Sequence, residues 1–120
     1  MDTLFGGRAA SISDKDSLFG EKTMTTYVTL INFTEQGLKT IKDTVKRSEA
    51  AKKTAAANGV KVKEILWLQG QYDMVVISES DDDTKRMALV LNTLKNGNVR
   101  GQTLRAYTAS EMEKILEQVA

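Results

Sequence analysis

The sequence contains no histidine and no cysteine. Without imidazole and thiolate ligands, most zinc, copper and iron–sulfur sites are excluded. Disulfide bonds, cysteine nucleophiles and histidine general bases are excluded as well. We therefore expect neither a metal ion nor another cofactor, and any acid–base chemistry would fall to carboxylates or tyrosines.

Proline is also absent, which favours long helices and strands without interruption. No apolar run approaches the about 18–20 residues of a membrane span, and the N-terminus lacks the apolar core of a secretory signal. The 17 basic and 16 acidic side chains leave a net charge of +1, so no strong attraction to nucleic acid or anionic lipid is expected. We expect a cytoplasmic protein that binds neither a membrane nor a specific nucleic acid.

The 120 residues fit one domain preceded by a segment of different composition. Residues 1–23 hold two near-copies of one motif, DTLFG at 2–6 and DSLFG at 16–20. On a flexible arm, such a duplication would raise the affinity for a multivalent partner through effective concentration. The docking candidates are Leu4, Phe5, Leu18 and Phe19.

Three other interpretations of this arm stay open. It could be a disordered leader, an expression tag, or a segment whose Leu-Phe pairs hold it against its own domain. We predict an arm at residues 1–23 that docks into a larger protein assembly, and a globular domain at residues 24–120.

The globular part alternates strand-like and helix-like segments. Runs rich in β-branched and aromatic residues predict four strands, at 25–33, 60–68, 72–78 and 99–107. Helical spacing of apolar residues predicts helices at about 34–57 and 111–119, with a second helix between them that residues 80–83 open and residues 96–98 end. The predicted buried stripe of the second helix consists of Met87, Val90, Leu91 and Leu94.

Two charged runs have a functional and a structural interpretation. Asp81, Asp82 and Asp83 suggest a metal site, but a cation loop needs oxygens at alternate spacing, so a helix cap favoured by the helix dipole is the simpler account. The lysine-rich helix at 34–57 suggests an anion or nucleic-acid patch, but overall neutrality favours a solvated face.

Residues 70–73 read Gly-Gln-Tyr-Asp and lead into the apolar run 74–77. The glycine suits the tip of a hairpin, and the run suits a strand that is buried on both faces. This motif resembles the signature of the GYD-domain family, small proteins largely without assigned function. The resemblance extends from about residue 25 to the C-terminus. The ligand-binding domain of feast/famine regulators has a similar hairpin and forms rings, but their DNA-binding helix-turn-helix has no counterpart here.

The element order βαββαβ plus a terminal helix predicts an α+β, ferredoxin-like fold with a four-stranded antiparallel sheet. Both main helices would cover one face of this sheet. The strands at 25–33 and 72–78 are apolar on both faces, so the uncovered face would expose a large apolar patch. We therefore expect a homodimer of the α+β-barrel type, or a larger ring built from it.

Few aromatic or charged side chains lie within the predicted strands. The ligand-binding candidates are Tyr27, Thr29, Trp67, Tyr72, Asp73, Thr103 and Arg105. Asp73 is the one catalytic candidate, as a base or ligand anchor, and Arg100 or Arg105 could pair with it or clamp a carboxylate. The structural alternative makes Asp73 a turn residue, Arg105 a barrel-rim residue and Trp67 part of the core.

Three functions remain open for this chain. It could be a non-catalytic homo-oligomer that binds a small molecule, or an interaction subunit docked through its arm. The alternative is a cofactor-independent enzyme of oxygenase or isomerase type. The missing catalytic side chains favour the first two over the enzyme.

Overall fold

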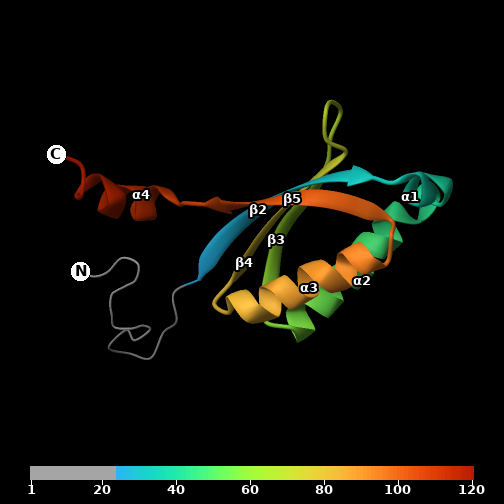
Figure 1. Cartoon of the computed structure of the whole chain (residues 1–120), viewed down its shortest axis with the longest axis horizontal. Coiled ribbons are helices and arrows are strands. Elements are labelled where there is room, and N and C mark those ends of the chain that lie inside the picture. The colour runs from blue at the N-terminus through green and yellow to red at the C-terminus, as the bar shows by residue number, and fades with distance from the viewer. Residues whose placement is uncertain (1–23) are drawn as a thin grey trace.

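The computed structural model describes residues 24–120 (Figure 1). The predicted arm at residues 1–23 and its four docking candidates lie outside the described residues, so docking through the arm stays a prediction.

The described chain alternates strands and helices along its whole length. The strands are β2 (Thr25–Phe33), β3 (Val60–Trp67), β4 (Met74–Ser80) and β5 (Val99–Ala106). The helices are α1 (Glu35–Lys39), the 3-10 turn η1 (Ile41–Asp43), α2 (Thr44–Ala57), α3 (Asp83–Lys95) and α4 (Ala109–Leu116).

The four strands form one antiparallel sheet in the order β3-β4-β2-β5. Together with the element order, this topology confirms the predicted α+β class and is compatible with the ferredoxin-like fold. Strand β2 lies inside the sheet, where Tyr27 faces Ser78 of β4 on one side and Arg105 of β5 on the other. Strands β3 and β5 form the two edges, and a bulge interrupts β3 between Val62 and Glu64.

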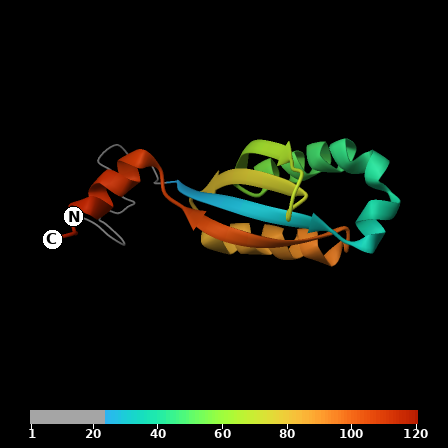
Figure 2. The ribbon, with the colours of Figure 1, turned by 90° about the horizontal axis from the view of Figure 1, so that it is seen from above.

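Helices α2 and α3 lie over the same face of the sheet, and Figure 2 looks onto the other face. The strand pairing and the contacts of two side chains identify the residues on the face that the helices cover. Tyr27 contacts α3 through Asp83, and Trp67 contacts the first residue of α2, Thr44. Trp67 pairs with Met74, and Met74 pairs with Ile31 of β2. Because alternate residues of a strand share a face, Ile31 lies on the same side of β2 as Tyr27. We call this side of the sheet the covered face.

The opposite side, which we call the open face, carries no described helix (Figures 1 and 2). Its apolar residues come from all four strands: Val28, Leu30, Leu66, Val75, Ile77 and Leu104. The two from the edge strands are the most exposed, Leu66 at 47% and Leu104 at 41%. The expectation of an uncovered apolar face is therefore confirmed for the single chain.

The long helix predicted at 34–57 is divided in the structure. Thr34 caps α1 by accepting a hydrogen bond from the backbone N–H of Gly37, as expected. The backbone then leaves the helical conformation at Thr40 (φ −117°, ψ 34°). The guanidinium of Arg47 in α2 donates to the carbonyl oxygens of Gly37 and Thr40, at 3.2 and 2.9 Å, and thus satisfies carbonyl groups that the break leaves free.

The buried stripe predicted on the second helix is largely wrong. Val90 is half-buried, but Met87, Leu91 and Leu94 are exposed, because Arg86 and Val90 occupy the side of α3 that faces the sheet. The last helix, α4, projects from the end of β5 and stands apart from the sheet and the other helices (Figures 1 and 2). No helix among residues 24–120 has the length and hydrophobicity that crossing a bilayer requires.

Gly37 provides a direct test of how α1 packs. A Cβ at this position would penetrate the carbonyl group of Asn98, in the loop that enters β5. Gly37→Ala should therefore lower the free energy of unfolding by about 1–3 kcal/mol, although alanine normally stabilises a helix. Lys39→Ala, at an exposed position of the same helix, should change it by less than about 0.5 kcal/mol. Urea unfolding measures both, and a stabilised Gly37→Ala variant would refute this packing.

Candidate functional site

Asp73 lies just before β4 and connects the β3–β4 hairpin to the end of β2. Its Oδ2 accepts a hydrogen bond from the backbone N–H of Phe33 at 2.9 Å, and Asn32 Nδ2 lies 3.4 Å away. Its own backbone N–H donates to the carbonyl of Ile31 at 2.8 Å, and its carbonyl accepts from the N–H of Leu68. The carboxylate thus satisfies a backbone donor at the end of a strand, as the structural interpretation proposed, but the donor belongs to β2 and not to the hairpin.

Neither arginine considered as a partner contacts Asp73 within the described residues. Arg105 forms an ion pair with Glu111 at 3.4 Å, donates to the carbonyl of Ala106 and lies 4.2 Å from the centre of the Tyr107 ring. Arg100 lies on the open face, as Asp73 does, but no ion pair joins the two among the described residues. The suggested pairing of Asp73 with an arginine is therefore not found there, and its carboxylate is hydrogen-bonded to the end of β2 instead.

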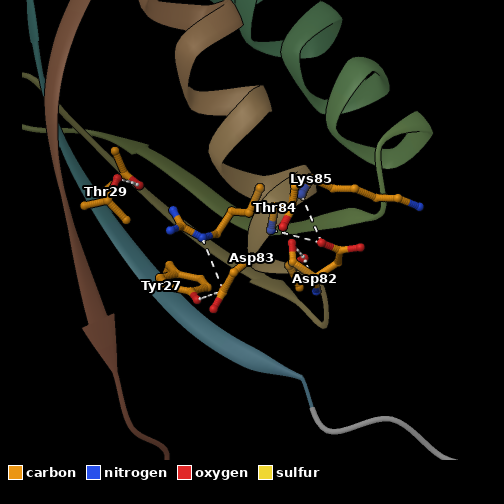
Figure 3. Close-up of polar contacts among 9 residues, drawn as sticks. Tyr27, Thr29, Asp82, Asp83, Thr84 and Lys85 are labelled. Carbon is orange, nitrogen blue, oxygen red and sulfur yellow. Dashed lines mark hydrogen bonds and ion pairs between the residues drawn. The ribbon is translucent and has the colours of Figure 1, made fainter.

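Three side chains on the covered face form what we call the Tyr27 cluster: Tyr27, Asp83 and Arg86 (Figure 3). The Tyr27 hydroxyl donates to Asp83 Oδ1. The guanidinium carbon of Arg86 lies 3.9 Å from the centre of the Tyr27 ring, and Arg86 Nε lies 3.9 Å from Asp83 Oδ1. The cluster therefore attaches the first turns of α3 to the central strand β2 by a hydrogen bond, a cation–π contact and an ion pair.

The start of α3 is held in place by its cap. Asp82 accepts hydrogen bonds from the backbone N–H groups of Thr84 and Lys85, at 2.9 and 3.0 Å (Figure 3). This confirms the helix-cap interpretation of the acidic run for Asp82. Among residues 24–120, no three acidic side chains converge into a group that could hold a metal ion.

The environment of Tyr27 shifts its proton equilibrium. Burial comes first, and the hydrogen bond to Asp83 and the negative charge of that carboxylate add to it; together they raise the pKa of Tyr27 above the ordinary value of 10.0. The positive charge of Arg86 opposes this shift only in part. Tyr27 is therefore a neutral phenol at physiological pH, able to donate a hydrogen bond but unsuited to act as a base.

The seven ligand-binding candidates are divided between the two faces of the sheet. The covered face carries Tyr27, Thr29, Trp67, Thr103 and Arg105, whereas Tyr72 and Asp73 belong to the open face. The hydroxyl groups of Thr29 and Thr103 are hydrogen-bonded to each other at 3.2 Å (Figure 3). The indole N–H of Trp67 donates to Thr44 at 3.1 Å, but 44% of this residue is exposed, so it lies over the core rather than in it.

A hollow of about 190 Å³ lies on the open face at one end of the sheet. Its lining consists of Leu30, Asn32, Tyr72, Arg100, Gly101 and Gln102. The Tyr72 hydroxyl lies 3.4 Å from Gln102 Oε1 and donates toward it. A cation, a phenol and two amides thus line this hollow beside Leu30, and these groups can donate hydrogen bonds to an anion.

Tyr72 was a ligand-binding candidate from the sequence and Arg100 a possible carboxylate clamp, but Asn32 and Gln102 were not placed in a site. Their even positions on two strands were visible in the sequence, but the register that puts Asn32 opposite Arg100 was not. A larger hollow of about 410 Å³ beside the edge strand β3 contains none of the predicted site residues; Lys52 and Lys61 supply its charge.

The raised pKa of Tyr27 gives a prediction about stability. A group whose pKa is higher in the folded state stabilises the protein below its unfolded pKa, and this contribution is lost as pH rises through the folded pKa. Tyr27→Phe should therefore lower the free energy of unfolding by about 1 kcal/mol at pH 7. The difference in this free energy between the variant and the wild type should become smaller above about pH 10. Urea unfolding from pH 7 to 11 measures this, with Tyr107→Phe at an exposed tyrosine as the control. A deficit that does not change with pH would contradict the assignment.

Comparison with known proteins agrees with the hairpin motif. The family model described as GYD domain matches residues 27–116, from the central strand β2 to the end of α4. Neither the search of curated proteins nor the search of solved structures found a significant match to the chain. Because the family match covers most of the chain and includes the Gly-Gln-Tyr-Asp hairpin at 70–73, this protein belongs to the GYD domain family.

Proposed function

We propose that this chain is a non-catalytic homodimeric module that binds a small carboxylate ligand between its two copies. In this proposal the two sheets pack open face to open face, as in an α+β barrel. The observation that carries it is the open face itself, an apolar surface across all four strands with a polar hollow at one end.

The residues of the open face support the proposal that another protein chain covers it and that it is not exposed to water. Leu66 and Leu104 lie on the two edge strands, and the apolar residues of β2 and β4 lie between them. An apolar patch that extends across a sheet in this way is typical of an interaction surface. Charged side chains occur around it, among them the ion pair of Lys63 with Glu79 at 3.6 Å. An apolar centre with a charged rim is the usual anatomy of a protein interface.

A second copy on the open face would enclose the hollow. Water would then be excluded from around Arg100, which strengthens its attraction for an anion. A guanidinium matches the two oxygens of a carboxylate, and Tyr72 and Asn32 can add hydrogen bonds to the same ligand. The volume of about 190 Å³ suits a small acid, since drug-sized ligands occupy pockets of roughly 300–1,000 Å³.

The alternative, a cofactor-independent enzyme, has weaker support from the described residues. Its catalytic candidate, Asp73, uses its carboxylate to hold the end of β2. Tyr27 is a phenol with a raised pKa and lies on the covered face, away from the hollow. Only Tyr72 would remain as an acid–base group in the hollow, so turnover abolished by Tyr72→Phe would favour the enzyme over the binding module.

The dimer can be tested at the two exposed leucines of the open face. Leu66→Glu and Leu104→Glu should each shift the wild-type dimer to a monomer, because a charge would be buried without a partner in the interface. Light scattering measures the mass, and circular dichroism checks that the variants are folded. Val45→Glu, at an apolar residue of α2 that is also exposed, should leave the dimer intact. A wild-type protein that stays monomeric at all concentrations would refute the dimer.

Ligand binding can be tested with two arginines on opposite faces of β5. Benzoate and amino acids serve as carboxylate probes, and benzamide serves as the neutral control. A carboxylate present at about 100 times its Kd should stabilise the protein by about 2.7 kcal/mol, seen as a raised melting temperature. Arg100→Gln should abolish this increase, and Arg105→Gln should retain it. If no carboxylate raises the melting temperature, or if Arg105→Gln is the variant that fails, the proposed site is wrong.

A further inference from the structure

Helix α4 is apolar on one side and has no partner along that side. Met112, Ile115 and Leu116 lie at positions i, i+3 and i+4 of the helix, and Val119 follows shortly after its end; all four are exposed. Helix α4 makes no extended packing contact with another described helix or strand (Figures 1 and 2). A helix of eight residues is marginal in water by itself, so it needs an apolar surface against which to pack.

Local contacts hold α4 in the direction in which β5 leaves the sheet. Thr108 and Glu111 form a reciprocal capping box at its N-terminus. Glu111 also forms the ion pair with Arg105 at 3.4 Å, and Arg105 lies over the ring of Tyr107. The two-residue connection between β5 and α4 is therefore held by contacts of Arg105, which precedes it, and of Glu111, which follows it. Folding α4 back over its own domain would break the Arg105–Glu111 ion pair, which connects the helix to β5.

Helix α3 presents an apolar surface long enough to receive the stripe of α4. Met87, Leu91 and Leu94 recur at positions i, i+4 and i+7, beside the side of α3 that faces the sheet. They are 48%, 55% and 39% exposed. The stripe of α3 extends over about two helical turns, so the shorter stripe of α4, about one turn long, can lie along it.

The charges of the two helices that remain for another chain are opposite in sign. Glu111 is paired with Arg105, which leaves Glu113 and Glu117 against Lys114 in and directly after α4. Arg86 is paired with Asp83 near the sheet, which leaves Lys85 and Lys95 on α3. Pairing α4 with α4 of another chain would bring acidic residues together, whereas pairing it with α3 brings opposite charges together.

We propose that α4 of one chain packs along α3 of a second copy, with the apolar stripe of α4 on Met87, Leu91 and Leu94. Helix α3 lies over the covered face of the sheet, so this contact is separate from the open-face dimer and does not depend on it. Combined with that dimer, the α4–α3 contact links dimers into a larger assembly.

Single cysteines test this contact cleanly, because the native chain has none. Full-length Ile115→Cys and Leu91→Cys proteins, which differ in mass through a tag on one of them, are mixed and treated with a short bismaleimide crosslinker. The expected product is a covalent pair containing one chain of each kind. Lys114→Cys, on the opposite side of α4, mixed with Leu91→Cys is the matched control and should give far less product.

Each other outcome overturns the proposal. A crosslink within one chain of the Ile115→Cys/Leu91→Cys double variant at high dilution would mean that α4 folds back. Crosslinking of Ile115→Cys with itself would mean that α4 pairs with α4, and absence of any Ile115–Leu91 product would mean that α4 packs elsewhere. Repeating the mixture in the Leu66→Glu background separates the two interfaces: the crosslink should persist there, even though the open-face dimer is disrupted.

Discussion

Strand β2 forms hydrogen bonds with β4 along one edge and with β5 along the other, and it is apolar on both of its faces. A strand of this kind is stable only when both sides of its sheet are covered. Helices α2 and α3 cover one side, and the described chain supplies nothing for the other (Figures 1 and 2). The need to cover this second side is the physical basis of the proposed dimer. In that dimer, the second copy would also enclose the ligand hollow.

Most of the polar residues singled out in the sequence turn out to connect elements of the fold. Asp73 caps the end of β2, Tyr27 binds the start of α3, and Arg105 holds the connection to α4. Each of these groups is hydrogen-bonded or paired, as partly buried polar groups must be. Arg100 differs from them, since it lines a hollow in which a ligand can approach its guanidinium.

Local patterns predicted the strands and caps well because their causes lie in neighbouring residues. The β-branched runs became strands, Thr34 and Asp82 became helix caps, and the glycine hairpin at 70–73 indicated the family. Predictions that required distances between segments were less successful. The break after Lys39 depends on Arg47 and on the approach of Asn98 to Gly37, and the exposure of Leu91 depends on which side of α3 faces the sheet. The spacing of apolar residues within one segment carries no information about these contacts between segments.

The sequence by itself determined the class of fold, the order of elements and the excess of apolar surface, because composition and alternation are properties of short segments. It also excluded cysteine and histidine chemistry outright. Only the tertiary structure decided which side of the sheet each candidate occupies, because a strand's two faces become distinct only when helices settle on one of them. That choice placed Tyr27 under α3 and Arg100 on the open face, and it left α4 extended with its apolar side uncovered.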